Sequence, residues 1–389
     1  MAKQSNSKVP KIRFKGFEDE WGDKKLGSLC EEFHSGKFIR ASEISKTGSY
    51  PVYGGNGVRG FSKTYNHDGL YALIGRQGAL CGNLNLFLGK AFFTEHAVAV
   101  QANGDNETHF LFYLLGRMNL GQYSAQSAQP GLAVNKIQQL ISPVCEKIEQ
   151  KRISGFFREL DQLLELHQRK HDKLVTLKKA MLQKMFPQPG TTAPKIRFKG
   201  FSRPWGEKPI GEILSETKRS IVLEDNTQYE LVTVKRRNGG VVSRGRLWGR
   251  EILVKNYSRL ETGDFLISKR QVVHGATGIV PPALNNAIVS NEYLVAVANG
   301  QITTEFLTIL ASLPDMLQKF FLSSYGVDIE KLFFDVEDWK KRTATIPMLP
   351  EQTQISRYFR TLDELISKHS VQLEKLKQIK SACLERMFV

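Results

Sequence analysis

The sequence contains an internal repeat, and this repeat restricts the possible folds more than any other feature. The segment Pro10–Phe17 (PKIRFKGF) recurs unchanged as Pro194–Phe201, an offset of 184 residues, and Trp21-Gly22 recurs as Trp205-Gly206. Such self-similarity indicates one structural unit present twice. Two units also suit a chain of 389 residues, because single hydrophobic cores rarely grow beyond about 250–300 residues.

A second pair of matching segments has a different offset. Phe156–Phe186 matches Tyr358–Phe388, which lies 202 residues later. The segments between the repeated parts differ in length and hardly align. We therefore expect each unit to consist of an opening motif, a diverged middle and a long C-terminal segment.

The two C-terminal segments carry an apolar heptad pattern. The repeated positions are Ile153, Leu160, His167, Leu174, Met181 with Phe157, Leu164, His171, Lys178, Met185, and Ile355, Leu362, His369, Leu376, Cys383 with Phe359, Ile366, Leu373, Lys380, Met387. Apolar positions at this spacing predict a helix that needs a partner helix, and the chain supplies one in each copy. We expect each helix to start soon after a proline, Pro143 or Pro350, and the first to stop at Pro187–Gly190.

A duplicated chain favours pseudo-two-fold symmetry, which would make the two helices antiparallel and place the middles at opposite ends, as in a dumbbell. A helix of about 34 residues spans roughly 50 Å, more than one turn of duplex DNA at about 35 Å. The predicted fold class is α+β: two strand-rich globular domains joined by two long helices that pair as an antiparallel coiled coil. The expected boundaries are a first globular domain at 1–150, a first long helix at 151–187, a linker at 188–193, a second globular domain at 194–349 and a second long helix at 350–389.

The charge balance suggests a polyanionic partner. Lys and Arg number 55 against 39 Asp and Glu, a formal net charge of +16, which suits DNA, RNA or an anionic membrane surface. No apolar run approaches the ~20 residues of a spanning helix, and residues 1–9 lack the apolar stretch of a signal peptide. We expect a soluble, cytoplasmic protein without a membrane partner. The four cysteines, Cys30, Cys81, Cys145 and Cys383, are scattered and are expected to be reduced packing residues.

The middles contain predicted strands punctuated by glycine. In the first, Asn56-Gly57 predicts a tight turn, 70–74 a buried strand and 92–100 another strand around His96. In the second, 229–234 and 265–267 predict strands.

Arg and Gln follow a predicted buried strand in both middles, as Arg76-Gln77 and Arg270-Gln271. Arg can hold guanine, and Gln or Asn adenine, with two hydrogen bonds in the major groove. Other basic residues are expected to contact phosphate, which positions a protein without reading sequence. The candidate DNA-binding residues are Arg59, Lys63, Arg76, Gln77, Lys90, His96, Lys235, Arg236, Arg237, Arg244, Lys269, Arg270, Gln271 and Asn291. The alternative for each is a solvated surface position, and Trp21 and Trp205 are expected in the core.

The sequence offers little sign of chemistry. His167 and His171 have the spacing of a helical zinc pair, yet Leu373 replaces the second histidine in the other copy, so we interpret them as polar residues that fix helix register. No metal site, catalytic residue or cofactor site is expected. Glu149-Gln-Lys151 and Asp338-Trp-Lys340 match only the last part of a nuclease-type acid-x-Lys pattern, and no nucleotide-binding glycine loop or adenine-binding Asn/Asp-Pro-Pro-aromatic motif is present.

Several motifs together resemble a known family. They are Lys11–Phe17 followed by Trp21, Pro-x-x-x-Glu-Gln-x-x-Ile at Pro347–Ile355, and Leu362-Asp363 opening a long helix. This arrangement resembles the specificity subunit of type I restriction-modification enzymes over the whole chain, and Tyr50–Gly57 (YPVYGGNG) resembles one type of target-recognition domain in that family.

One departure concerns the start of the first helix. The first copy reads Pro143–Gln150, two residues longer than the second copy before Glu-Gln. Only the position at which that helix begins is affected.

The resemblance implies a DNA-binding subunit of a phage-defence system. Each target-recognition domain would read one half of a bipartite, asymmetric site on double-stranded DNA, and the helices would set the gap. The implied partners are two modification (methyltransferase) subunits, which use S-adenosylmethionine, and restriction (motor-nuclease) subunits, which use ATP and Mg²⁺; none of these cofactors is expected on this chain. The exposed helix faces and nearby loops are the implied docking surface for the modification subunits.

Two other classes of function remain open. The chain could be a stand-alone DNA-binding regulator or a phage-type competitor for modification subunits, or an unrecognised nuclease or methyltransferase. For the main reading, half-site centres about one duplex turn apart, near 10 base pairs, leave an unread gap of roughly 6 to 7 if each domain reads some 3 to 4 base pairs.

Overall fold

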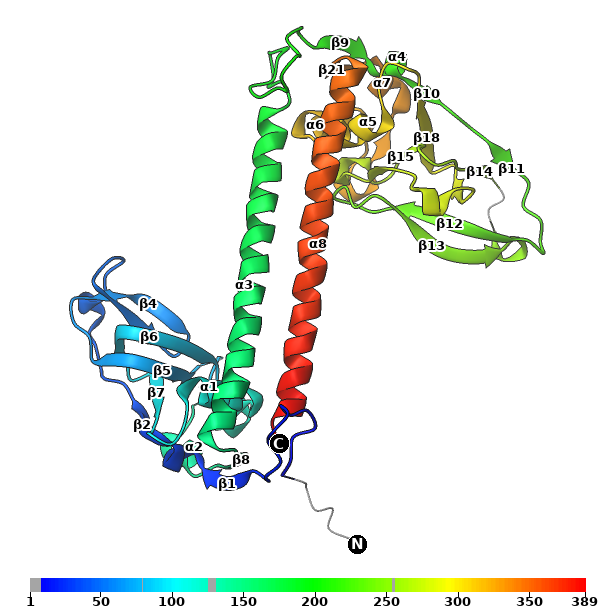
Figure 1. Ribbon diagram of the computed structural model, residues 1–389. Coiled ribbons are helices and arrows are strands. Elements are labelled where there is room, and N and C mark those ends of the chain that lie inside the picture. The colour runs from blue at the N-terminus through cyan, green and yellow to red at the C-terminus, as the bar shows by residue number, and fades with distance from the viewer. Residues whose placement is uncertain (1–7, 79, 125–130, 254–255) are drawn as a thin grey trace. The chain divides into compact units, whose positions relative to one another are not determined.

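The computed structural model describes residues 8–78, 80–124, 131–253 and 256–389, so most of the polar segment 1–9 lies outside the described residues. The chain forms two compact units, Met1–Arg169 with His369–Val389, and Lys170–Lys368. Each unit contains one globular part and a portion of each long helix (Figure 1). The domain boundaries drawn from the sequence stay a prediction. Among the described helices, none is long and apolar enough to cross a membrane.

The two long helices are α3, Lys147–Lys184, and α8, Leu349–Met387. Helix α8 begins one residue before Pro350, so the expectation of a start after this proline was wrong. Proline is tolerated in a first helical turn because the N–H it lacks has no partner there. Helix α3 ends shortly before Pro187, which cannot continue it.

In the first unit the helices run antiparallel. His167 and His369 place their Nδ1 atoms 2.8 Å apart, and Lys380 Nζ donates to Asp161 Oδ1 at 2.5 Å. Positions therefore rise along α8 as they fall along α3. The predicted pairing of the two helices, in the predicted direction, is confirmed here.

The second unit contains the same arrangement. Lys178 Nζ donates to Asp363 Oδ1 at 2.5 Å, and the rings of Phe186 and Phe359 lie 6.2 Å apart. Lys178, a polar residue at one of the repeated heptad positions, is thus paired across the interface between the two helices. Such a pair is what a residue that fixes helix register requires.

A six-stranded sheet forms the globular part of the first unit, with strand order β2-β7-β5-β6-β3-β4. Its strands are β2 Cys30–Ser35, β3 Tyr50–Gly54, β4 Gly57–Ser62, β5 His67–Gly75, β6 Leu84–Phe93 and β7 Ala97–Ala102, and the short helical segments are η1 Leu26–Leu29, η2 Ala41–Glu43, η3 Leu120–Tyr123, α1 Thr108–Arg117 and α2 Val134–Gln138. All pairs are antiparallel except β3 with β6. The strand expected at 92–100 is instead the end of β6 and the start of β7, because the chain turns at Thr94, whose carbonyl accepts from Ala97 N.

Helix α1 lies against one face of this sheet and beside α3 (Figure 1). Tyr113 on α1 packs its ring 4.9 Å from Phe157 and donates its hydroxyl to Asp161 at 2.8 Å. Trp21 is buried in the same core and contacts the ring of Phe388, so its predicted core position is confirmed.

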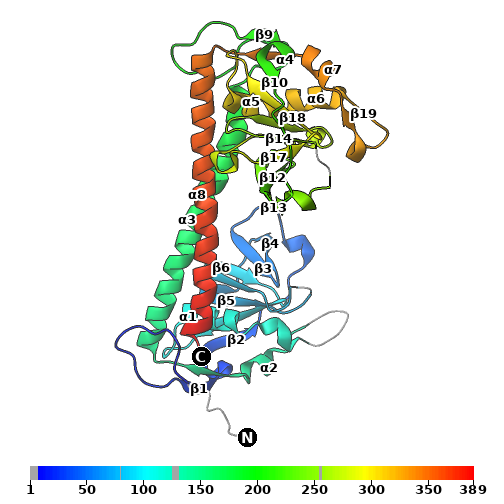
Figure 2. The same ribbon diagram turned by 90° about the vertical axis from the view of Figure 1, so that its right-hand side faces the viewer.

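The second unit contains a four-stranded sheet, β10-β18-β15-β16, and a five-stranded sheet, β11-β14-β17-β12-β13. The strands are β10 Leu214–Glu216, β11 Ser220–Ile221, β12 Gln228–Val234, β13 Val241–Trp248, β14 Tyr257–Arg259, β15 Phe265–Ser268, β16 Thr277–Ile279, β17 Ile288–Ser290, β18 Tyr293–Ala298 and the pair β19 Ser324–Tyr325 and β20 Phe333–Phe334; the helices are α4 Ile210–Ile213, α5 Thr304–Ala311, α6 Pro314–Leu322 and α7 Val336–Lys341, with η4 Gly249–Glu251, η5 Val272–His274, η6 Pro282–Leu284 and η7 Ile329–Lys331. Helix α5 lies beside α8 (Figure 2). Trp205 is buried, as predicted, and packs on Phe186 and Phe306.

Each unit contains an equivalent two-stranded antiparallel sheet. Strand β1, Gly22–Lys25, pairs with β8, Ile141–Val144, and strand β9, Gly206–Pro209, pairs with β21, Thr343–Ile346. The registers correspond, with Gly22 opposite Val144 and Gly206 opposite Ile346. These sheets connect the repeated opening motif to the segment that leads into each long helix.

The diverged middles also share a core of strands, although their sequences hardly align. The order β2-β7-β5 in the first unit corresponds to β10-β18-β15 in the second, and a helix follows β7 and β18. Glu107 caps α1 and Thr303 caps α5, each through its side chain. Beyond this core the middles differ, since β5 continues into β6, β3 and β4 whereas the second unit adds a separate five-stranded sheet.

Candidate nucleic-acid interface

In the first unit a hollow of about 620 Å³ brings three candidate residues together. Arg59 on β4, Gln77 after β5 and His96 before β7 line it, with the turn Gly55–Gly57 and Gly131. The side chains of Arg59 and Gln77 are exposed. The hollow therefore presents a guanidinium, an amide and an imidazole in one place.

Backbone contacts fix these positions. Arg76 N donates to His96 O at 2.9 Å, and Leu132 N donates to Arg76 O at 2.9 Å. The β3–β4 turn passes so close to the end of β5 that a Cβ on Gly75 would lie 2.1 Å from Gly55 O. Glycine is required at such an approach.

The chemistry of the hollow suits base edges better than an apolar ligand. Arg can donate twice to guanine, and an amide can both donate to and accept from adenine. Val58, about half exposed at the rim, is an apolar surface for a thymine methyl group.

The other candidates of this unit lie differently. Arg76 turns inward, with Nη1 3.3 Å from Ser35 Oγ and Nε 3.4 Å from Leu132 O, so its side chain supports the hollow. Lys63 is exposed after β4. Lys90 lies over the Tyr65 ring at 4.8 Å and 3.9 Å from Asp68, and Tyr65 and Asp68 raise its pKa.

In the second unit the β12–β13 turn carries the basic run Lys235, Arg236 and Arg237, all exposed. Arg237 has φ 59°, and its N–H donates to His274 O at 2.8 Å, which holds the turn against the segment after β15. Arg236 Nη2 is 2.6 Å from Glu330 Oε2, so part of its charge is already compensated.

A smaller hollow of about 140 Å³ contains two further candidates, Lys269 and Asn291. Lys269 Nζ donates to Asn291 O at 3.0 Å. Lys218 and Tyr257 line the same hollow and were not singled out from the sequence, since neither follows a predicted buried strand.

The remaining candidates are separate from that hollow's lining. Arg270 pairs with Glu292 at 3.1 Å and covers the Phe333 ring at 4.9 Å. Gln271 has its Oε1 buried without a hydrogen-bond partner. Arg244 lines another hollow, of about 310 Å³, on β13.

The two acid-x-Lys patterns have structural roles. Glu149 is buried and accepts two hydrogen bonds from Arg13, which raise the pKa of that guanidinium. Asp338 accepts from Arg342 Nη2 at 2.9 Å, and bonds to Ser323 and Arg342 lower its pKa. Both carboxylates are thus engaged by arginine.

The histidines of α3 are not directed at a shared point. His167 contacts His369, whereas His171 lies 3.0 Å from Asp172. This agrees with the register interpretation.

Helix α8 also lines a groove in the second unit. Its volume is about 970 Å³, and residues of β16 and α5 form the other side. Arg357, Arg360 and Glu364 of α8 line it with Ile309 of α5, so the groove combines charge with an apolar floor.

Together these features define a class of protein with two copies of one unit. Each copy has basic and amide side chains exposed on strand-rich surfaces. Each copy also has the same frame, which consists of the repeated opening motif and the long helix. Residues 18–176 match the protein family described as the type I restriction modification DNA specificity domain. This match covers 159 of the 389 residues, namely most of the first globular part and most of α3, and the matched region is similar to that domain family.

Individual relatives agree with this similarity. The specificity subunit of the type I restriction enzyme EcoprrI from Escherichia coli is 44% identical over 133 residues, 33% of this chain and 33% of the relative. A putative type I restriction enzyme specificity subunit from Haemophilus influenzae is 25% identical over 132 residues, 33% of this chain and 34% of the relative. The chain thus matches these curated relatives over about a third of their length.

The fold has a solved counterpart. The crystal structure of the type I restriction-modification system S subunit from M. genitalium superimposes with a TM-score of 0.68 at 14% identity, covering 98% of this chain and 99% of that one. The likeness establishes the fold of the full chain as that of an S subunit.

Proposed function

We propose that the chain is the sequence-reading specificity subunit of a type I restriction-modification complex and is not an enzyme by itself. The observation that carries the proposal is the convergence of Arg59, Gln77 and His96 in one hollow of the first unit. Convergent bidentate donors on a glycine-lined surface serve base recognition.

The second unit would read a different half-site. Its exposed residues lie on the β12–β13 turn, which belongs to the separate five-stranded sheet, and around Lys269, which follows β15. Two different reading surfaces on one frame suit an asymmetric, bipartite target, whereas two identical surfaces would suit a palindrome.

The proposed partners are double-stranded DNA, two modification subunits and restriction subunits. S-adenosylmethionine, ATP and Mg²⁺ would be used on those other subunits. The groove along α8, with Arg360 and Glu364 on its wall, is a docking surface we assign to a modification subunit.

Methylome sequencing of cells that carry this gene with its partner genes tests the reading function. We expect a split motif with two unlike halves. Arg59→Ala and Gln77→Ala should change or erase one half and leave the other half intact. Matched controls are the exposed Arg117→Ala and Gln139→Ala outside the hollow, which should leave both halves unchanged. A contiguous motif, or equal effects of test and control variants, contradicts the proposal.

The gap between the halves is tested separately. If the helices set it, a heptad added to both α3 and α8 should lengthen the gap beyond the roughly 6 to 7 base pairs expected from one duplex turn. A gap that stays the same after insertion contradicts the role of the helices as a ruler.

The same materials separate the alternatives. A stand-alone regulator would bind a specific DNA site without any methyltransferase, and a competitor would bind modification subunits without supporting methylation. An unrecognised nuclease would nick DNA as the pure chain and lose that activity in Asp338→Ala. The proposed subunit should instead co-purify with a methyltransferase and direct its methylation.

A further inference from the structure

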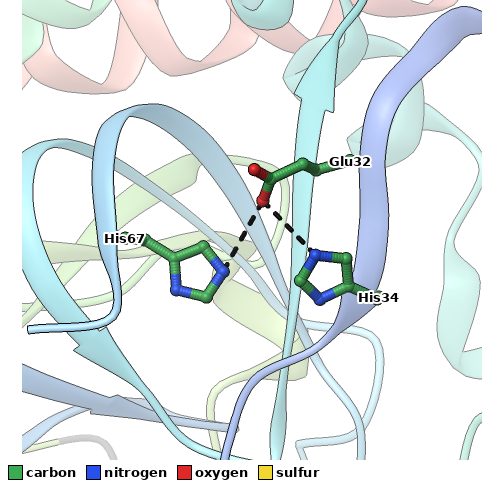
Figure 3. Close-up of side chains that lie close together, drawn as sticks. All are labelled: Glu32, His34 and His67. Carbon is green, nitrogen blue, oxygen red and sulfur yellow. Dashed lines mark ion pairs between the residues drawn. The ribbon is translucent and has the colours of Figure 1, made fainter.

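Three side chains in the first unit form a cluster that DNA reading does not explain. Glu32 and His34 lie on β2, and His67 begins β5 (Figure 3). Glu32 Oε2 is 3.4 Å from His34 Nε2 and 3.6 Å from His67 Nε2. One possible ligand atom from each residue lies within 4.8 Å of the others.

The strand geometry places these side chains on one face. Residues two apart on a strand point the same way, so Glu32 and His34 share a face while Phe33 enters the core on the other. Strand β7 runs between β2 and β5, and it presents the small Ala99 opposite His34. A small side chain on the middle strand leaves room for groups to meet across it.

Hydrogen bonds determine which ring nitrogen of His67 faces the cluster unprotonated. Asn66 Nδ2 donates to Phe93 O and its Oδ1 accepts from Phe93 N, which fixes the orientation of this amide. Since Asn66 Oδ1 is an acceptor 2.7 Å from His67 Nδ1, that nitrogen must carry the proton. The neutral ring therefore directs the lone pair of Nε2 toward Glu32.

His34 is oriented in the same way. Its Nδ1 lies 3.1 Å from the carbonyl oxygen of Ser35, which can only accept, so Nδ1 is the donor. In the neutral ring its Nε2 is then also an acceptor. A metal-ligating histidine usually donates its other nitrogen to such an oxygen, which sets the tautomer and the ring position.

The carboxylate completes a set of facing acceptors. Glu32 Oε2 is buried and has no hydrogen-bond partner, although both imidazole nitrogens point at it. His67 is fixed further by stacking on Phe93, with ring centroids 4.5 Å apart. With both rings neutral, three acceptor atoms therefore face one another.

The distances fit a small cation. Donor atoms about 2.0–2.1 Å from a tetrahedral ion lie about 3.3–3.4 Å from one another. The two Glu32–histidine separations, 3.4 and 3.6 Å, are close to this value, and the ligand atoms of the two histidines lie within 4.8 Å of each other.

We infer that the first unit binds one divalent transition-metal ion through Glu32 Oε2, His34 Nε2 and His67 Nε2. Two imidazoles and one carboxylate suit Zn²⁺ best and leave a fourth position free. That position faces solvent, because the His34 side chain is 56% exposed whereas that of His67 is 5% exposed. The ion would join β2 to the start of β5 across β7.

The competing explanation is an ordinary ion pair, in which one imidazole takes up a proton beside Glu32. It predicts no metal affinity. Other pairs of this kind exist, such as His96 Nε2 with Glu95 Oε1 at 3.4 Å, which has no third ligand group among the described residues.

The full chain, prepared without a polyhistidine tag and stripped with EDTA, is titrated calorimetrically with Zn²⁺, and Co²⁺ is used as a spectroscopic probe. We expect one equivalent to bind, to raise the melting temperature and to give the visible bands of a four- or five-coordinate Co²⁺ site. His34→Ala and Glu32→Gln should lower Zn²⁺ affinity by about 100-fold or more.

The control variant is His96→Ala, which removes an equally spaced His–Glu pair and should leave the stoichiometry and affinity for Zn²⁺ unchanged. Because His34 is exposed, its variant should keep the circular dichroism of the metal-free parent. Absence of stoichiometric binding, or parental affinity in both His34→Ala and Glu32→Gln, would overturn the inference. These readouts do not involve DNA, so they are independent of the proposed reading function.

Discussion

Arg13 binds Glu149 through two hydrogen bonds, from Nε to Oε1 at 2.7 Å and from Nη2 to Oε2 at 2.8 Å. Arg197 binds Glu351 in the same bidentate way, at 2.6 and 2.7 Å. In each copy the arginine of the opening motif therefore holds the first turn of a long helix. Since Glu149 is only 2% exposed, this pair is a structural element of the frame.

The same motif also contacts the end of the other long helix. Ile12 N donates to Arg386 O, and Ile196 N donates to Lys184 O, both at 2.9 Å. Carbonyl groups at a helix C-terminus lack partners within the helix. The repeated letters of the opening motif are thus explained by contacts with the start of one helix and the end of the other.

Arg13→Met should strongly destabilise the first unit. It leaves the Glu149 carboxylate buried without its partner, which costs about 3–5 kcal/mol, and most of this should return in Arg13→Met with Glu149→Leu. Urea denaturation measures the loss in free energy of unfolding, and hydrogen exchange shows where in the chain it occurs. Lys8→Ala breaks an exposed pair with Asp23 and should cost less than about 1 kcal/mol. Equal losses in the two single variants would contradict this role.

Gln352→Ala should destabilise the second unit by about 1–3 kcal/mol, the cost of leaving buried polar groups unpaired. The Gln352 amide donates to Gln301 O and Pro347 O and accepts from Thr303 N. Gln354→Ala, two residues further along the same helix and exposed, is the matched control and should be nearly neutral. Similar midpoints in urea for both variants would argue against the buried network.

Two equivalent ion pairs across the helices should respond differently to charge exchange. Either single charge reversal, Lys178→Asp or Asp363→Lys, should lower the free energy of unfolding by roughly 1 kcal/mol or less, because both side chains are partly exposed. The double reversal should restore this loss.

In the first unit the equivalent exchange, Lys380→Asp with Asp161→Lys, should restore stability only in part. The reason is that Asp161 also accepts from the Tyr113 hydroxyl at 2.8 Å, and lysine cannot accept this bond. A double-mutant cycle for each pair measures the difference. Full recovery in both units would contradict the contribution of Tyr113.

The frame could be predicted from the sequence because its contacts restrict which amino acid can stand at each position. Arg13, Glu149 and Trp21 recur since each meets a partner that a different side chain would leave unsatisfied or unfilled. The heptad pattern likewise predicted the helix pairing, because burial along α3 follows the apolar positions.

The common core of the middles could not be predicted. Val98 on β7 and Leu294 on β18 occupy corresponding places, and a buried strand accepts many apolar side chains of suitable size. Insertions between strands also change the offset between corresponding residues of the two copies. Neither residue identity nor spacing therefore reveals the shared strand order.

The candidate site was predicted residue by residue but not as an arrangement. Arg59 comes from β4, Gln77 from the segment after β5 and His96 from the turn before β7, and their meeting depends on the turn at Gly55 crossing the end of β5. The group of Glu32, His34 and His67 was missed entirely, since its parts lie on two strands with no helical spacing to signal them.

The thiols should be unreactive in the folded chain. Burial raises the pKa of Cys30 to about 12 and also raises the pKa values of Cys81, Cys145 and Cys383. At pH 8 only roughly 10⁻⁴ of a thiol with that pKa is thiolate, the reactive form. Iodoacetamide labelling followed by mass spectrometry should be slow for Cys30 until urea unfolds the unit.

The sign of the pH dependence follows from the same shift. Because the folded pKa of Cys30 lies above its unfolded value, stability is fully retained below about pH 8.5. Stability should decrease as pH rises toward 12, since the unfolded chain loses its proton first. Fast labelling of native Cys30 at pH 8 would contradict its burial.

Gly75→Ala should disable the hollow of the first unit. The new Cβ would lie 2.1 Å from Gly55 O, which forces the β3–β4 turn away from Gln77 and His96. We expect recognition of one half-site to be lost while the other half-site is still read, as measured by binding to oligonucleotides that carry each half alone. Gly104→Ala is the control, because nothing lies within 4 Å of a Cβ there. If both variants lose the same half-site equally, the hollow is not the reading surface, since only one of the two substitutions moves it.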